Sequence, residues 1–270
     1  MAPEAMGAAG WFGRWRRARA VGRQAIDDAL WQRVVSRLSF LRALSPDEQR
    51  RLRELTALFL DRKPVSGAGG LELTREMQLV IAAQACLLVL NLDLDLYDDW
   101  VEVIVYPDEF IADHEYMSED GVVHRVRSPL SGEAWERGPV ILSWVDAQAA
   151  DGGDGYNVVL HEFAHKIDMR NGAANGFPPL HAGMDRAAWA DTFSAAFADF
   201  RGRLDRREET PLDEYAAQDP AEFFAVLSEL FFERPGALHA MYPAVYGQLA
   251  AFYRQDPLAR MRPAGTGAPA

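Results

Sequence analysis

Cysteine is almost absent from this 270-residue sequence, in which Cys86 is the only one. A single cysteine excludes an internal disulfide and any zinc site built from several cysteines. Because Cys86 lies within an apolar run, we expect its thiol to be buried and inert.

Long hydrophobic runs are absent as well. The longest covers residues 79–90, contains Gln84, and is too short to cross a bilayer. The basic, aromatic segment 11–19 is not followed by the apolar core of an export signal. We therefore expect a cytoplasmic protein without a membrane span, in which this segment is a solvated arm or, alternatively, an amphipathic anchor.

Positive charge is scarce. The sequence has 28 lysine and arginine residues against 40 aspartate and glutamate residues, which gives a formal net charge of −12. Direct binding of nucleic acid is not expected, because phosphate binding requires a basic surface. Hydrophobic residues make up 49% of the chain, which is enough for a large core in a globular protein.

The predicted elements fall into three groups along the chain. Helices are expected at about 24–41, 45–60 and 74–91, then strands at 101–106, 122–126 and 139–144, then helices at about 157–170, 187–204, 220–233 and 243–254. Residues 61–70 are expected to form a loop. This order predicts an α+β fold, mostly helical, with a small mixed sheet before the helix at 157–170.

One domain is expected over residues 21–257. Its N-terminal helical part extends to about residue 95, and its catalytic part covers about 96–257. Residues 1–20 and 258–270 are expected to be a disordered arm and tail, since alanine, glycine and proline are frequent at both ends.

Residues 161–165 read His-Glu-Phe-Ala-His, an H-E-x-x-H motif. Residues at i and i+4 lie one above the other on a helix, so the imidazoles of His161 and His165 can bind one metal ion. Glu162 points to the side of the pair, where it can take a proton from metal-bound water. The apolar residues of this segment fall on the opposite face, which favours a helix at the floor of a cleft. The alternative is an ordinary amphipathic helix with surface histidines.

A catalytic zinc ion usually has three protein ligands, and the third histidine of the metzincin motif is absent because Asn171 stands in its place. The best candidate is Glu222, which lies in a strongly apolar helix where a buried carboxylate needs a partner. Alternatively, Asp219 and Glu222 form a capping box. Glu229 is either another ligand or an acceptor for the N–H group of a ligating histidine. His181 and His239 are weaker candidates.

Two long segments resemble a known family. They are VVLHEFAHKIDMRNG at 158–172 and EYAAQDPAEFFAVLSELFF at 214–232, and they closely resemble the Mlc titration factor A family of bacterial zinc peptidases, as do ILSW at 141–144 and YRQDPLAR at 253–260. The resemblance implies a zincin-like metallopeptidase core, related to the catalytic domain of anthrax lethal factor. It also implies a gluzincin-like site in which His161, His165 and Glu222 hold one Zn²⁺ ion.

The same resemblance implies residue roles and an activity. Glu162 would be the general base, and Tyr215, seven residues before Glu222, would be a catalytic tyrosine. The family is cytosolic, has aminopeptidase-like activity on peptides, and binds the glucose-responsive transcriptional repressor Mlc. A function of another class is a regulatory protein that sequesters a transcription factor, with hydrolysis secondary.

Two structural alternatives concern substrate access. The strand at 139–144 is either an edge strand that pairs with an extended substrate or an interior strand. The loop at 172–186 could close over the site as a lid.

Overall fold

The computed structural model describes residues 22–117, 123–130, 132–135, 137–150 and 155–261. Most of the described residues are helical. The α-helices are α2 (Asp28–Arg37), α3 (Ser39–Arg42), α4 (Pro46–Arg62), α5 (Arg75–Leu88), α6 (Trp144–Ala149), α7 (Val158–Asp168), α8 (Arg186–Asp205), α9 (Pro220–Glu233), α10 (Pro235–Met241), α11 (Pro243–Tyr253) and α12 (Pro257–Met261). Three 3₁₀ helices are η1 (Leu94–Tyr97), η2 (Met169–Asn171) and η3 (Glu214–Ala217).

All described strands precede α7. They are β1 (Val65–Gly67), β2 (Val103–Tyr106), β3 (Phe110–Met117), β4 (Val123–Leu130), β5 (Gly132–Ala134) and β6 (Val140–Ser143). Four of them form a mixed sheet in the order β1-β2-β6-β5, in which only β5 is antiparallel to its neighbour. The prediction of an α+β fold, mostly helical with a small mixed sheet before the helix of the motif, is confirmed.

The N-terminal helices differ from the prediction at one point. The single helix expected at 24–41 is wrong, because Leu38 adopts an extended backbone (φ −112°, ψ 117°) that separates α2 from α3. This break turns the chain so that Phe40 and Leu41 are buried. The predicted cap of the next helix is confirmed: Ser45 and Glu48 form a capping box at the start of α4.

The sheet contains strands that the sequence pattern did not predict. Residues 61–70 are not only a loop, since β1 lies within them, and its three residues are held by parallel pairing with β2. Strand β6 confirms the prediction at 139–144, but β6 lies between β2 and β5, so the edge-strand alternative is wrong and the interior one is right. The edge strand on this side is β5, whose three residues are too few to give an alternating pattern.

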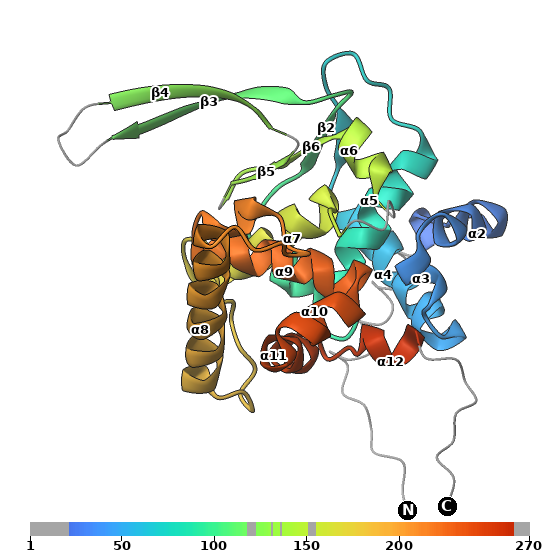
Figure 1. The fold of residues 1–270 in the computed structure, drawn as a ribbon. Helices are drawn as coiled ribbons and strands as arrows, with labels where there is room; N and C mark the ends of the chain where they lie inside the picture. The colour runs from blue at the N-terminus through green and yellow to red at the C-terminus, as the bar shows by residue number, and fades with distance from the viewer. Residues whose placement is uncertain (1–21, 118–122, 131, 136, 151–154, 262–270) are drawn as a thin grey trace, which may run out of the picture.

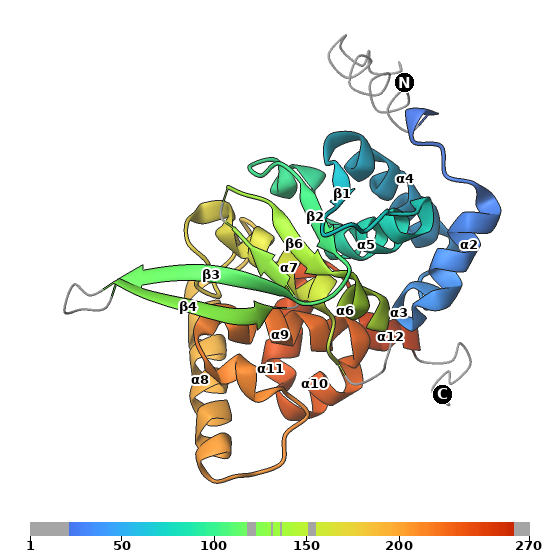
Figure 2. The ribbon, with the colours of Figure 1, turned by 90° about the horizontal axis from the view of Figure 1, so that it is seen from above.

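A separate antiparallel hairpin is formed by β3 and β4. It extends well beyond the body of the molecule in both views (Figures 1 and 2). The strand expected at 122–126 therefore corresponds to part of β4, and β3 was not predicted.

Helix α7 lies at the centre of the fold, where it packs against α5, α9 and strand β5 (Figure 1). All eleven of its residues are buried. On one side, the Phe163 ring meets an aromatic cluster formed by Phe59, Tyr97 and Trp100. Cys86 on α5 is fully buried, as predicted, and burial raises the pKa of its thiol.

The C-terminal helices continue past the expected domain end at residue 257. Helix α12 includes residues 258–261, and Arg260 donates to the Glu48 carboxylate on α4 at 2.5 Å. The expected arm at 1–20 and the residues after 261 lie outside the described part of the chain. Within the described part, no helix is long and apolar enough to cross a membrane.

Candidate metal centre

The two histidines of the motif lie on α7 as the spacing predicted. Asn157 caps this helix by accepting from the Leu160 N–H group at 3.0 Å. The Nε2 atoms of His161 and His165 are 3.1 Å apart, one helical turn along the same face. Both side chains are buried, with residue exposures of 8% and 7%, so the alternative of surface histidines is wrong.

Glu222 reaches this pair from α9. Its Oε2 atom is 3.0 Å from His161 Nε2 and 3.3 Å from His165 Nε2. Asp219 caps α9 by accepting from the N–H groups of Ala221 and Glu222, and the Glu222 carboxylate lies against the histidines. Burial raises the pKa of Glu222, but its hydrogen bonds with His161 and His165 outweigh this effect, so the pKa lies below its ordinary value.

These three side chains fit a divalent metal ion. Their candidate ligand atoms all lie within 4.8 Å of one another. Ligands at 2.0–2.1 Å from a tetrahedral zinc ion would be about 3.3 Å apart, and the observed separations of 3.0, 3.1 and 3.3 Å are close to that value. Two imidazole nitrogens and one carboxylate oxygen are also a donor set that zinc accepts.

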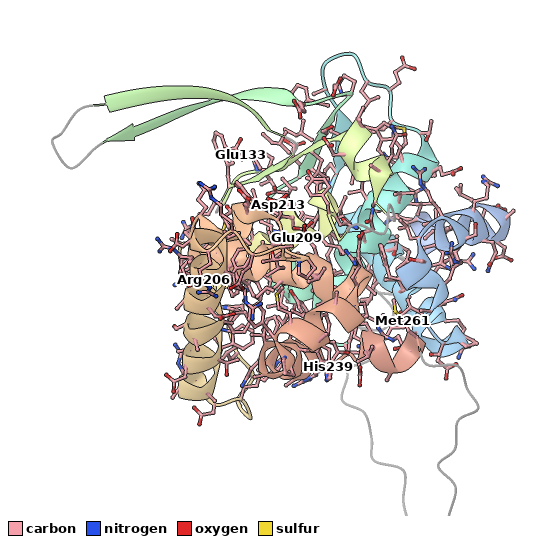
Figure 3. All side chains as sticks on the ribbon, in the orientation of Figure 1. Glu133, Arg206, Glu209, Asp213, His239 and Met261 are labelled. Atoms are coloured by element: carbon pink, nitrogen blue, oxygen red, sulfur yellow. The ribbon has the colours of Figure 1, made fainter. Side chains whose placement is uncertain are left out.

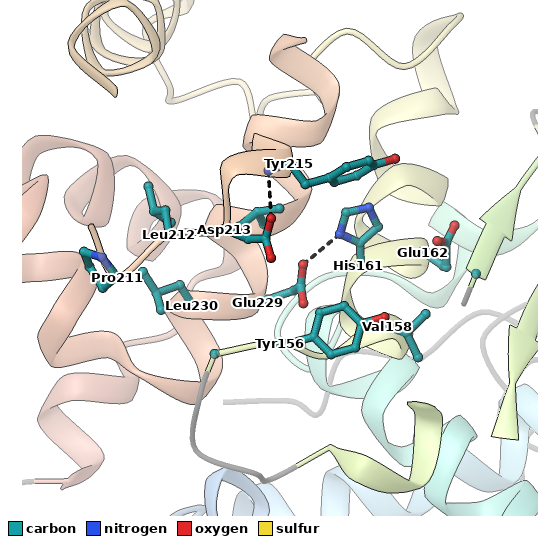
Figure 4. Close-up of a pocket in the computed structure, with 13 residues that line it drawn as sticks. Tyr156, Val158, His161, Glu162, Pro211, Leu212, Asp213, Tyr215, Glu229 and Leu230 are labelled. Carbon is teal, nitrogen blue, oxygen red and sulfur yellow. Dashed lines mark hydrogen bonds and ion pairs between the residues drawn. The ribbon is translucent and has the colours of Figure 1, made fainter. Parts of the chain in front are cut away.

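Glu229, which the sequence left open between two roles, lies on the far side of His161. Its Oε1 atom is 2.7 Å from His161 Nδ1, and its Oε2 atom accepts from the Asn157 N–H group (Figure 4). This contact makes Nδ1 the donor and leaves Nε2 of His161 free to face Glu222 as an electron-pair donor. Glu229 is therefore placed as an acceptor for the histidine N–H group rather than beside the Nε2 atoms.

A buried polar network extends this arrangement to α5, and the sequence analysis missed it. The Asn157 side-chain amide donates to Gln84 and to Glu233, at 2.8 Å each. Asn157 thus caps α7, binds Glu229 and connects α5 with α9. The polar Gln84 in an otherwise apolar segment was the one signal in the sequence that could have indicated this network.

Glu162 lies beside the histidine pair, and 5% of its surface is exposed. Burial raises its pKa, and the positive charge of the two histidines opposes this rise only in part. Strand β5 passes directly against it: a Cβ atom added to Gly132 would lie 2.5 Å from Glu162 Oε1. The close approach requires glycine at this position of the edge strand.

Tyr215 lies on η3, which is capped by Asp213 through the Tyr215 N–H group at 2.7 Å. The ring centroid of Tyr215 is 6.1 Å from that of His161, and 48% of the residue is exposed. Partial burial and the nearby carboxylates of Glu222 and Glu162 raise the pKa of its phenol, which therefore carries its proton at neutral pH. The family resemblance was the only sequence signal for this residue.

The two weaker histidine candidates lie elsewhere. His181 Nε2 is 2.6 Å from the Phe252 carbonyl oxygen. His239 lies on α10 against the Tyr246 ring, away from α7 (Figure 3). Neither belongs to the group that could hold a metal ion.

Part of the 172–186 loop is held in place. Asp168, at the end of α7, accepts from the N–H groups of Asn175 and Gly176 at 2.7 Å each. Trp189 donates to the Gly176 carbonyl at 3.1 Å. These bonds fix this part of the loop near the start of α9, which disfavours the lid alternative for these residues.

A cavity of about 560 Å³ opens in front of His161 and Glu162 (Figure 4). Helix α7 contributes Val158 to its wall, and α9 contributes Val226, Glu229 and Leu230. The remaining lining residues are Gly132, Gly155, Tyr156, Pro211, Leu212, Asp213 and Tyr215. The cavity is large enough for part of a peptide.

Comparisons with known proteins point to one family. The sequence profile of the family described as glucose-regulated metallo-peptidase M90 matches residues 12–254, which extends the likeness upstream into the basic segment. Mlc titration factor A of Klebsiella pneumoniae strain 342 is 41% identical over 237 residues, covering 87% of this chain and 89% of that protein. Mlc titration factor A of Serratia proteamaculans strain 568 is 40% identical over 242 residues, covering 88% and 92%.

Proposed function

The chain belongs to the glucose-regulated metallo-peptidase M90 family, and we propose that it is a zinc-dependent, aminopeptidase-like peptidase acting in the cytoplasm. The observation that carries the proposal is the convergence of His161, His165 and Glu222 within 3.0 to 3.3 Å of one another, with Glu162 alongside. A structural metal site would have no use for a buried carboxylate beside the ligands.

The ligands would be His161, His165 and Glu222, and the zinc ion would lower the pKa of a water molecule and polarise the scissile carbonyl. Glu162 accepts the proton of the attacking water and passes it to the leaving amine. Glu229 keeps the His161 ring in the tautomer that binds metal.

Tyr215 acts on the negative charge that develops on the substrate oxygen. Its phenol keeps its proton at neutral pH and so can donate a hydrogen bond to the oxyanion that forms at the scissile carbon. Strand β5 is the edge of the mixed sheet and passes against Glu162, so an extended peptide can pair with it and present its carbonyl to the site.

Metal analysis and a cleavage assay test this proposal. Purified protein should contain one zinc ion per chain and should cleave peptides from a mixed library, and a chelator should abolish cleavage. Glu162→Gln should abolish turnover and keep the metal, whereas His161→Ala should lose both. Full activity of Glu162→Gln would contradict the role given to this residue.

A second function is favoured by the names of the relatives, which are called Mlc titration factor A. We propose that the chain also binds an Mlc-type transcriptional repressor, with or without hydrolysis. A pull-down with the Glu162→Gln protein separates the two functions. Capture of a purified Mlc-type repressor by this inactive variant would support a regulatory role that does not need turnover, and failure of both proteins to capture it would exclude that role.

A further inference from the structure

The cavity in front of His161 lies beside the residues that would carry out the reaction. Glu162 is part of its wall, and Val158, one turn before Glu162 on α7, lies beside it. In the proposed mechanism, the proton that Glu162 takes from water goes to the leaving amine. The leaving part of the substrate therefore lies on the side of Glu162, which is the side of the cavity. This step rests on the proposed function.

Strand β5 bounds the same cavity through Gly132. A peptide that pairs with an edge strand directs alternate side chains to opposite faces. Gly132 lies in close contact with Glu162 and Val158. The backbone of a substrate peptide paired with β5 at this position would therefore run directly above α7. The residue after the scissile bond then points its side chain down toward the cavity.

Apolar side chains form about half of the cavity wall. Val158, Leu212, Val226 and Leu230 are buried, with exposures of 3%, 5%, 7% and 1%, and Pro211 and Tyr156 complete the apolar part. Val226 and Leu230 follow Glu222 at intervals of four residues on α9, so they continue the helix face that carries Glu222. These residues come from three separate segments and line one cavity; Figure 4 labels all of them except Val226.

Three carboxylates also line the wall, those of Glu162, Asp213 and Glu229. Glu229 accepts from His161 and Asn157, and Asp213 accepts from the Tyr215 N–H group. An anionic substrate side chain placed here would lose its hydration and face these carboxylates. An apolar side chain would lose only its contact with water, which is favourable.

We propose that this cavity binds the side chain of the residue immediately after the scissile bond, and that it selects large apolar residues such as leucine and phenylalanine. The enzyme would then release products that begin with a large apolar residue. The proposal adds a substrate preference to the peptidase activity and names the residues that set it, Val226 and Leu230 above all.

Internally quenched peptides that differ only at the residue after the scissile bond test this preference. Leucine and phenylalanine should give kcat/KM values at least about tenfold above those of glycine and aspartate. Val226→Phe should fill the cavity and remove most of the preference for phenylalanine while alanine remains accepted. Leu230→Ala should enlarge the cavity and shift the preference toward larger aromatic residues.

Val101→Phe is the matched control, because Val101 is 60% exposed and lies outside the cavity wall. It should leave the preference unchanged. Far-UV circular dichroism checks that each variant is folded. As a second measurement, saturation-transfer NMR should detect phenylalanine amide, a mimic of the leaving fragment, on the wild type and much less on Val226→Phe.

The outcomes separate the two proposals. If no peptide is cleaved in a metal-dependent way, the proposed function fails. If cleavage depends on metal but the residue after the scissile bond has no effect, or Val226→Phe keeps the wild-type preference, only the assignment of the cavity fails.

Discussion

Gly132 on β5 touches the side chain of Glu162 on α7 so closely that no Cβ atom fits between them. A Cβ atom at Gly132 would lie 2.5 Å from Glu162 Oε1 and 2.7 Å from Glu162 Cγ. The edge strand and the proposed general base are therefore positioned by the same contact, 30 residues apart in the sequence. Any side chain at residue 132 must displace either the carboxylate or the strand.

We expect Gly132→Ala to lower kcat by about 10²-fold, because a displacement of about 1 Å at the reacting groups can have this effect. The metal ligands are untouched, so the metal content should stay at the wild-type value. Steady-state kinetics and metal analysis of the same preparation measure both quantities.

Gly247→Ala is the control for this substitution. A Cβ atom at Gly247, which lies on the exposed face of α11, would meet nothing within 4 Å. Activity should not change, and stability should rise by about 0.5–1 kcal/mol, because alanine favours helix over glycine. Wild-type kcat for Gly132→Ala would show that Glu162 tolerates the displacement and would contradict the positioning argument.

Tyr215→Phe removes the proposed donor to the oxyanion and the hydrogen bond between Tyr215 and Glu222. We expect kcat to fall by about 10²-fold with a small change in KM and no change in metal content. Stability should change by less than about 0.5 kcal/mol, since the side chain is about half exposed. Tyr156→Phe, in the same cavity wall, should leave kcat close to wild type. An equal loss in both variants would indicate a general effect of hydroxyl groups in the cavity.

Glu229→Gln keeps the size of the side chain but removes the charge that faces His161 Nδ1. We expect metal affinity to fall by about 10- to 100-fold, the usual effect of changing the residue that accepts from a metal-bound histidine. Competition with a chelator of known affinity measures this change. The control is Glu72→Gln, since Glu72 is exposed. Unchanged affinity for Glu229→Gln would mean that His161 does not need this contact.

The sequence correctly predicted features that depend on residues close together in the chain. The helix of the motif was predicted because apolar positions recur there with helical spacing. The capping box of Ser45 and Glu48 was predicted because the two residues are three positions apart. The placement of Gly132 against Glu162, and of Asn157 between α5 and α9, depends on contacts between distant segments. Such contacts leave no periodic pattern in the sequence. Tyr215 was found only because a family with the same spacing is known.

Strand β5 illustrates the same limit. Its three residues have intermediate burial and no alternation, and they form a strand because β6 offers a paired edge. The sequence instead indicated 139–144 as a possible substrate edge, and this segment became an interior strand. The chemistry of the site was readable from residue types, whereas the surface that receives the substrate was not.

The ion pair between Glu48 and Arg260 gives a prediction for stability and pH. Partial burial raises the pKa of Glu48, but hydrogen bonds from Ser45 and Arg260 outweigh this effect and leave the pKa below its ordinary value. A carboxyl whose pKa is lower in the folded than in the unfolded state stabilises the fold above its unfolded pKa. This contribution is lost as pH falls through the folded pKa.

Glu48→Gln should therefore lower the free energy of unfolding at pH 7 by about 1 kcal/mol, and the difference from wild type should shrink as the pH falls from about 5 to 3. Urea denaturation at several pH values measures it, with Asp47→Asn as the control because Asp47 is highly exposed. Truncation after Pro257 removes Arg260 and should reproduce part of the same pH-dependent loss, because the Glu48 carboxylate then loses its guanidinium partner. An equal difference at pH 3 and pH 7 would mean that the carboxyl charge of Glu48 does not stabilise the fold.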